Sequence, residues 1–109
     1  MDIVADLTAA PPSVTLAEPD DLGSFKVLAL APQAHPGSLA RALDGVGTIA
    51  EDGNAFIAVD AVKRLAGDRA NDPEWSAGLE KMLAYAASKG WMDPSGTAIQ
   101  AHVEWAPPA

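Results

Sequence analysis

The chain contains no cysteine, and this absence removes disulfides, thiolate metal sites and a cysteine nucleophile together. Its 109 residues are the usual size of one domain with a single hydrophobic core. Apolar residues make up 49% of the sequence, which is enough to build that core without disulfide staples. Because small secreted domains commonly need such staples, we expect a reducing compartment and a cytoplasmic protein.

The sequence carries no signal for secretion or for a membrane. Residues 1–6 lack both the basic and the apolar regions of a secretory signal. The longest purely apolar run, residues 27–32, is far shorter than the roughly 18 residues that a membrane helix needs. We therefore expect neither export nor a membrane partner.

Charge is distributed unevenly along the chain. The formal net charge is −8, from 15 acidic against 7 basic residues, and residues 1–22 hold five of the acids, three prolines and no Lys or Arg. We interpret residues 1–22 as an acidic leader, extended or partly disordered, that contributes little to the core; residues 14–16 are a candidate edge strand. Such a field repels polyanions, so we expect no nucleic-acid partner.

Local signals divide the middle of the chain into short elements. Residues 24–31 are apolar on both faces, which indicates an interior strand. A short helix is predicted over residues 38–44, capped by its serine. Asp52 and Gly53 lie between two apolar runs and predict a hairpin, and Asp60 is a candidate N-cap for a second short helix.

The clearest signals lie in the C-terminal third. Asp72 and Pro73 combine an N-cap with a proline at the first helical position, so they predict the longest helix. Residues 97–105 alternate apolar and polar side chains, as a half-buried strand does. The apolar stripe of the helix comprises Trp75, Leu79, Met82, Leu83 and Ala86.

Together these elements predict an α+β fold. We expect a small single domain of about four to five mostly antiparallel strands, with three helices packed mainly on one face. The globular domain would span residues 23–105, and residues 106–109 would form a frayed tail. The order helix, strand, helix, helix, hairpin over residues 38–105 also resembles a winged helix in topology, although neither its recognition helix nor its wing presents a basic face.

His102 and Glu104 are the pair best suited to chemistry. They lie two residues apart on the polar face of the final strand, so their side chains point the same way. They are candidates for a general base with its orienting carboxylate, or for half of a metal site. We favour a solvated face carrying a cross-strand ion pair, because metal sites need three or four convergent ligands, and we expect no metal.

His35 and two tryptophans are weaker candidates. His35 lies in a loop after the interior strand, where binding residues are common, although an ordinary turn residue is the simpler interpretation. Trp91 and Trp105 are candidates to line a ligand pocket or an interface, where tryptophan is enriched. We favour the interpretation that both fill the core or cover its edge.

Three classes of function remain open. We favour a non-enzymatic interaction or accessory module that binds a protein partner or self-associates as a homodimer, since no convergent catalytic set is present. The alternative is a small-molecule binding protein or a small enzyme, with a pocket near Trp91, His102 and Glu104. A winged-helix-like nucleic-acid binder is disfavoured by the acidic charge. No motif predicts a cofactor.

Overall fold

Six strands and three α-helices build the part of the chain that the structure describes. The computed structural model describes residues 1–107, without the side chain of Pro36. The strands are β1 (Asp2–Asp6), β2 (Ser13–Ala17), β3 (Lys26–Leu30), β4 (Gly47–Ile49), β5 (Ala55–Ala58) and β6 (Ala98–Ala106). The helices are α1 (Pro36–Ala42), α2 (Val59–Ala66) and α3 (Pro73–Ser88), and a 3-10 helix, η1 (Gly67–Asn71), connects α2 to α3.

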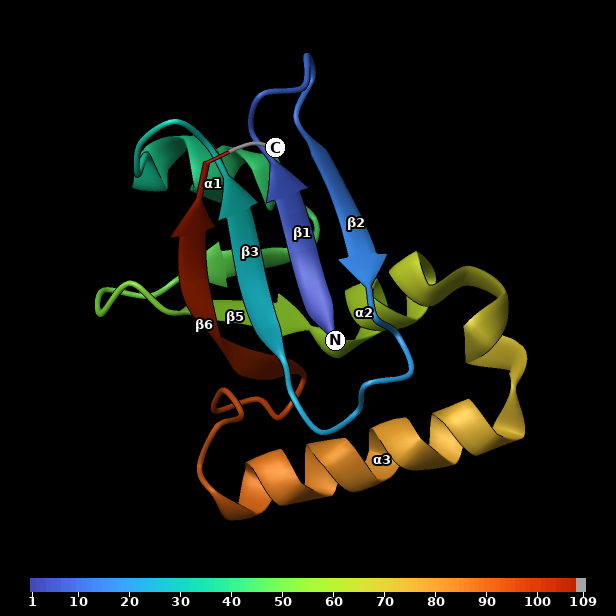
Figure 1. Cartoon of the computed structure of the whole chain (residues 1–109). Coiled ribbons are helices and arrows are strands. Elements are labelled where there is room, and N and C mark those ends of the chain that lie inside the picture. Colours follow the sequence, from blue (N-terminus) through green and yellow to red (C-terminus); the bar gives the residue numbers. More distant parts are fainter. Residues whose placement is uncertain (108–109) are drawn as a thin grey trace.

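All six strands form one mixed, curled sheet in the order β2-β1-β3-β6-β5-β4. Strands β1, β3 and β6 run parallel to one another, and the remaining pairs are antiparallel. Figure 1 shows the sheet curling so that β4 and β5 pass behind the other strands. The α+β class and the three helices are confirmed, and three of the five strand pairs are antiparallel, as expected. The number of strands was wrong, because the described residues form six strands rather than four to five, and β1 joins the sheet through parallel pairing with the distant β3.

Strand β1 lies inside the sheet, between β2 and β3. Met1 is 1% exposed, and Ile3 and Ala5 are fully buried. The expectation that residues 1–22 contribute little to the core is therefore wrong. Asp2 and Asp6 point to the opposite face from Ile3, so the acidic residues that suggested a solvated leader occupy only the outer side of a core strand.

Two strand predictions near β1 are confirmed. Residues 14–16 lie in β2, which forms one edge of the sheet, with Leu16 opposite Ile3 in the antiparallel register. Strand β3 is interior, as the apolar run over residues 24–31 predicts, and its Val27 and Ala29 are fully buried. The core therefore lies on the side of the sheet to which Ile3, Val27 and Ala29 point.

The hairpin between β4 and β5 is confirmed, with Gly53 at a positive φ of 89° in its turn. Gly47 permits close packing of the two strands, because a Cβ there would lie 2.2 Å from the carbonyl oxygen of Phe56. The proposed N-cap of the second helix was wrong: α2 begins at Val59, so Asp60 lies within its first turn. The chain enters the helix directly from β5 and leaves no loop for a side-chain cap.

The predicted long helix, α3, is confirmed. The side chain of Asp72 accepts a hydrogen bond from the backbone N–H of Glu74 at 2.9 Å, as an N-cap should. Trp75, Leu79 and Ala86 are buried. Met82 and Leu83, the other members of the stripe, are partly buried against the same core cluster.

Strand β6 alternates as predicted. Ile99 and Ala101 are buried, while His102 and Glu104 point to the other face and are exposed. The frayed tail was predicted to begin at residue 106, but Ala106 is the last residue of β6. Its carbonyl accepts a 3.0 Å hydrogen bond from the N–H of Ala31. Residues 108–109 of that tail lie outside the described residues.

The three helices pack against one core cluster of the sheet, two on its face and one across its end (Figure 1). Helices α1 and α2 lie behind the strands, whereas α3 crosses below their lower ends. This arrangement differs from a winged helix, because the chain puts all its strands into one sheet with parallel central strands. Within residues 1–107, no helix has both the length and the apolar character needed to cross a membrane.

Candidate functional site

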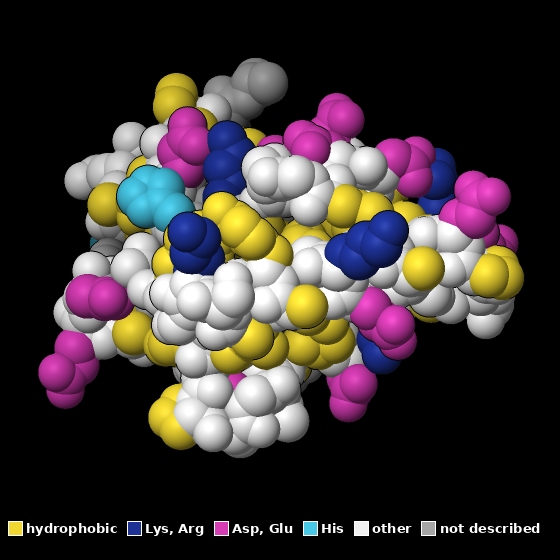
Figure 2. Space-filling model, turned by 90° about the horizontal axis from the view of Figure 1, so that it is seen from below, with side chains coloured by type: hydrophobic (Ala, Val, Ile, Leu, Met, Phe, Trp, Pro, Cys, Tyr) yellow, Lys and Arg dark blue, Asp and Glu magenta, His cyan; other side chains and the backbone are white. Residues whose placement is uncertain are grey.

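An apolar groove of about 740 Å³ runs beside α3, on the side that faces the sheet. Leu22 and Phe25, from the loop before β3, form one wall of this α3 groove, and Met82 and Tyr85 form the helix wall. Trp91 lines the end of the groove that follows the helix. Figure 2 views the molecule from the α3 side and shows hydrophobic side chains in the middle of this face, with acidic side chains mostly around its rim.

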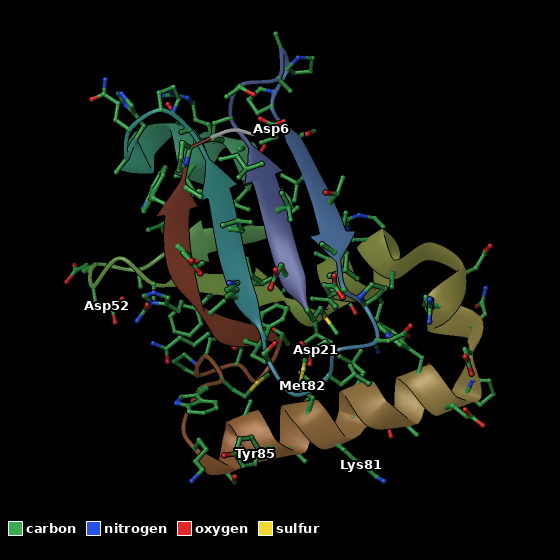
Figure 3. All side chains as sticks on the ribbon, viewed as in Figure 1. Asp6, Asp21, Asp52, Lys81, Met82 and Tyr85 are labelled. Atoms are coloured by element: carbon green, nitrogen blue, oxygen red, sulfur yellow. The ribbon has the colours of Figure 1, made fainter. Side chains whose placement is uncertain are left out.

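Helical spacing explains the wall on α3. Gly78, Met82 and Tyr85 lie at positions i, i+4 and i+7, so they share one side of the helix. In Figure 3, Met82 points from the helix towards the strands. Gly78 lets the loop before β3 approach α3 closely, because a Cβ at this position would lie 2.5 Å from Cδ1 of Leu22. The loop therefore packs closely on the middle of α3, and the groove opens towards the C-terminal half.

Two large aromatic side chains stand exposed at that open end. Tyr85 is 57% exposed and Trp91 is 44% exposed. Their ring centroids are 5.8 Å apart with an interplanar angle of 74°, an edge-to-face contact. An exposed pair of this size is unusual enough to suggest a binding role, whereas single exposed apolar residues are ordinary.

Backbone hydrogen bonds hold Trp91 in place. Its N–H donates to the carbonyl of Ala86 at 2.9 Å as the chain leaves α3, and Gly90 makes the reversal with a positive φ of 77°. The carbonyl of Trp91 accepts a 2.6 Å hydrogen bond from the N–H of Gln100 in β6. The indole is thus positioned by its main chain while its ring stays accessible.

A smaller polar hollow of about 340 Å³ adjoins the α3 groove. Phe25 and Trp91 line both spaces, and Asn54, Gln100 and His102 supply the polar groups of the hollow. The predicted candidates Trp91 and His102 therefore meet in one depression. Asn54 arrives from the hairpin between β4 and β5, a segment that sequence reasoning did not connect with either residue.

Glu104 forms a cross-strand ion pair on a solvated face, as the favoured interpretation expected, and its partner is Lys26 rather than His102. Its Oε2 accepts a 2.7 Å hydrogen bond from Nζ of Lys26 across the parallel β3–β6 pair. This contact holds the pKa of Glu104 below its usual range, with a smaller contribution from His102, and it raises the pKa of Lys26. Glu104 and His102 share a face, as predicted, but the carboxylate is directed to the lysine.

The remaining sequence candidates lie apart from the groove. His35 is exposed immediately before α1, and its side chain makes no capping hydrogen bond. Trp105 is partly buried and packs against the core cluster. Among residues 1–107, no group of three or more His, Asp or Glu side chains is placed to hold a metal ion.

Sequence reasoning missed most of the groove, including Tyr85, Met82 as a wall residue, and Phe25. One signal was present for Tyr85, which lies immediately before Ala86 of the apolar stripe and has a lysine four residues away on each side. An aromatic ring at the border of a buried stripe is a candidate for partial exposure. The sequence does not show how far along α3 the loop before β3 packs.

Comparisons of this chain with family models, with curated proteins and with solved structures give no match. The side chains of the groove and of the hollow are therefore the basis for inferring a function.

Proposed function

We propose that this chain is a protein-interaction module whose α3 groove takes an apolar segment of a partner protein. The observation that carries the proposal is the exposed Tyr85–Trp91 pair at the open end of an apolar groove. Tyrosine and tryptophan are enriched among the residues that dominate binding energy at protein interfaces. They offer large contact areas and lose little side-chain entropy on binding.

The walls of the groove also suit a peptide. Met82 and Leu22 are only partly buried and have flexible side chains, so they can adjust to the shape of an entering side chain. Catalysis is less well supported, because His102 and Glu104 are both exposed and Glu104 is paired with Lys26. A general base is normally placed where its environment tunes it towards proton transfer.

Peptide selection tests the proposal. Random peptides displayed on phage are selected on the wild-type protein and counter-selected on the Tyr85→Ala/Trp91→Ala double variant. The enriched peptides should share apolar side chains and bind the wild-type protein at least about tenfold more tightly than the double variant. A Thr15→Ala/Thr48→Ala double variant, changed at exposed strand positions, is the matched control and should bind like the wild type.

Circular dichroism must first show that the double variant is folded. Selected peptides that bind the double variant as tightly as the wild type would place the interaction elsewhere on the molecule. Failure to enrich any peptide over several rounds would count against the groove as a peptide site.

A small-molecule site is the second candidate, favoured by the polar hollow. Asn54, Gln100 and His102 converge beside the exposed ring of Trp91, and ligand sites commonly combine an apolar surface with a few polar groups. A thermal-shift screen of small compounds tests it. Compounds that stabilise the wild type but not His102→Ala would support this candidate, and hits unaffected by that substitution would contradict it.

A further inference from the structure

Two lysines flank Tyr85 beside the α3 groove. Lys81 and Lys89 lie four residues before and after it, so the three side chains form one row along α3 and its C-cap residue, Lys89. The Nζ of Lys89 lies 5.6 Å from the centroid of the Tyr85 ring, a cation–π contact. Lys81 itself lines the groove. The exposed aromatic side of α3 is therefore also basic.

Acidic groups near this row are engaged elsewhere or face away. The ion pairs among residues 1–107 join Lys26 to Glu104, Arg69 to Asp20, and the amino group of Met1 to Asp21, and none includes Lys81 or Lys89. The carboxylate of Asp21 accepts hydrogen bonds from the N–H of Gly23 and the hydroxyl of Ser24.

The nearest acid on the helix, Glu80, belongs to a different row. It lies one position from Lys81 and hence about 100° around the helix. A chain of net charge −8 thus presents a local basic rim beside its most exposed aromatic rings.

We propose that the segment bound in the α3 groove is acidic as well as apolar, with carboxylates placed against Lys81 and Lys89. This inference rests on the proposed function of the groove and specifies the chemistry of its partner. At physiological ionic strength, charges more than about 8 Å apart are largely screened. A carboxylate placed beside the edge of Tyr85, near the two lysines, therefore responds to them more strongly than to the acidic residues elsewhere on the surface.

A peptide fits this rim better than a nucleic acid does. A nucleic acid carries a phosphate at every nucleotide, and its affinity comes from neutralising many of them. Two lysines beside the groove neutralise few phosphates, and the acidic side chains around this face repel the others (Figure 2). An acidic peptide can place one or two carboxylates at the lysines and apolar side chains in the groove.

A matched pair of fluorescent probes tests the inference. The anion 8-anilinonaphthalene-1-sulfonate and the neutral N-phenyl-1-naphthylamine share an aromatic skeleton and differ in the sulfonate. In the Lys81→Gln/Lys89→Gln variant, we expect the preference for the anion over the neutral probe to fall about fivefold or more. In an Arg41→Gln/Lys63→Gln control, which loses the same charge outside the groove, the preference should change less than about twofold.

The outcomes separate the inference from the proposed function. If Trp91→Ala weakens the neutral probe but the lysine substitutions leave the preference unchanged, the acidic partner is ruled out and the groove stands. If Trp91→Ala weakens neither probe, or neither probe binds, the proposed function fails together with the inference. Micromolar binding of a short oligothymidylate that the lysine substitutions abolish would replace the acidic peptide with a single-stranded nucleic acid.

Discussion

The two ends of α3 carry similar residues with opposite surroundings. At the first end, Trp75 is 4% exposed and its indole N–H donates a 2.8 Å hydrogen bond to the carbonyl of Pro19. At the last end, Tyr85 and Trp91 are 57% and 44% exposed and contact each other edge to face. The first end of the helix therefore packs into the core, and the last end exposes aromatic rings to solvent.

The difference comes from the segment that covers the helix. Pro19 and Leu22 belong to the connection between β2 and β3, and they pack against the first half of α3 at Trp75 and Gly78. The connection then turns away into β3, and the α3 groove opens where its cover ends. Whether an aromatic residue is structural or available for binding thus depends on a segment about 60 residues away.

The largest effect is expected from removing β1, the strand that pairs with both β2 and β3 and thereby holds the connection between them over α3. Deleting residues 1–12 takes β1 from between β2 and β3, exposes the buried residues of β3 and frees the connection that covers Trp75. We expect the shortened chain to lose its cooperative thermal transition, followed by circular dichroism. A transition close to that of the full chain would show that β1 is dispensable.

A second test compares side chains at the two ends. Leu79→Ala should lower the free energy of unfolding by about 2–5 kcal/mol, because Leu79 is only 2% exposed and the cavity cannot collapse fully. Tyr85→Ala should lower it by less than about 1 kcal/mol. Urea melts of the two variants measure this, and equal losses would contradict the division of α3 into a structural and an open end.

A third test compares how the substitution of a tryptophan by phenylalanine at each end of α3 changes the free energy of unfolding. Trp75→Phe keeps most of the buried ring but removes the hydrogen bond to Pro19, so we expect a loss of about 1 kcal/mol. Trp91→Phe removes an exposed indole whose N–H has no hydrogen bond to the chain among residues 1–107, and we expect no measurable loss. If Trp91→Phe proved the more destabilising in urea melts, the assignment of the two ends would be reversed.

A further expected effect depends on pH and concerns the turn that follows Trp91. The carboxylate of Asp93 accepts hydrogen bonds from the hydroxyl of Ser95 and from the N–H groups of Thr97 and Ala98. These bonds, with Ser95 first, lower the pKa of Asp93, so its ionised form favours the folded state. The stabilisation is present above the ordinary aspartate pKa of about 4 and is lost as the pH falls through the lower folded value.

Asp93→Asn should therefore be less stable than the wild type at neutral pH. The difference should shrink as the pH falls below about 4, because the wild-type carboxyl group then becomes protonated. Urea melts of both proteins across this range measure the difference, and one that stays constant with pH would show that the charge of Asp93 does not contribute.

Sequence reasoning succeeded where a signal is local. Asp72 with Pro73 marks the start of α3, Asp52 with Gly53 marks the hairpin, and the alternation over residues 97–105 marks β6. Each depends on residues within a few positions, whose backbone preferences and side-chain directions follow from the chain itself.

The reasoning failed where the determinant is distant. The parallel pairing of β1, β3 and β6 joins segments that no local pattern connects. In β1 the two aspartates suggested a solvated leader, although they occupy only its outer face and Ile3 and Ala5 form a buried face. For the candidate site, Trp91 and His102 were identified as residues, but their meeting with Asn54 depends on the antiparallel register of β5 and β6, which pairs Ala55 with Ala101.

The indole N–H signals of the tryptophans give the most direct test that the open end of α3 is the binding end. They can be followed in a nitrogen–proton correlation spectrum of isotope-labelled protein titrated with 8-anilinonaphthalene-1-sulfonate, and assigned with the Trp75→Phe, Trp91→Phe and Trp105→Phe variants. The Trp91 signal should shift progressively with the probe, while that of Trp75, bonded to Pro19 beneath its cover, stays in place. A shift confined to Trp75 or Trp105, or an unmoved Trp91 signal at saturating probe, would contradict the account.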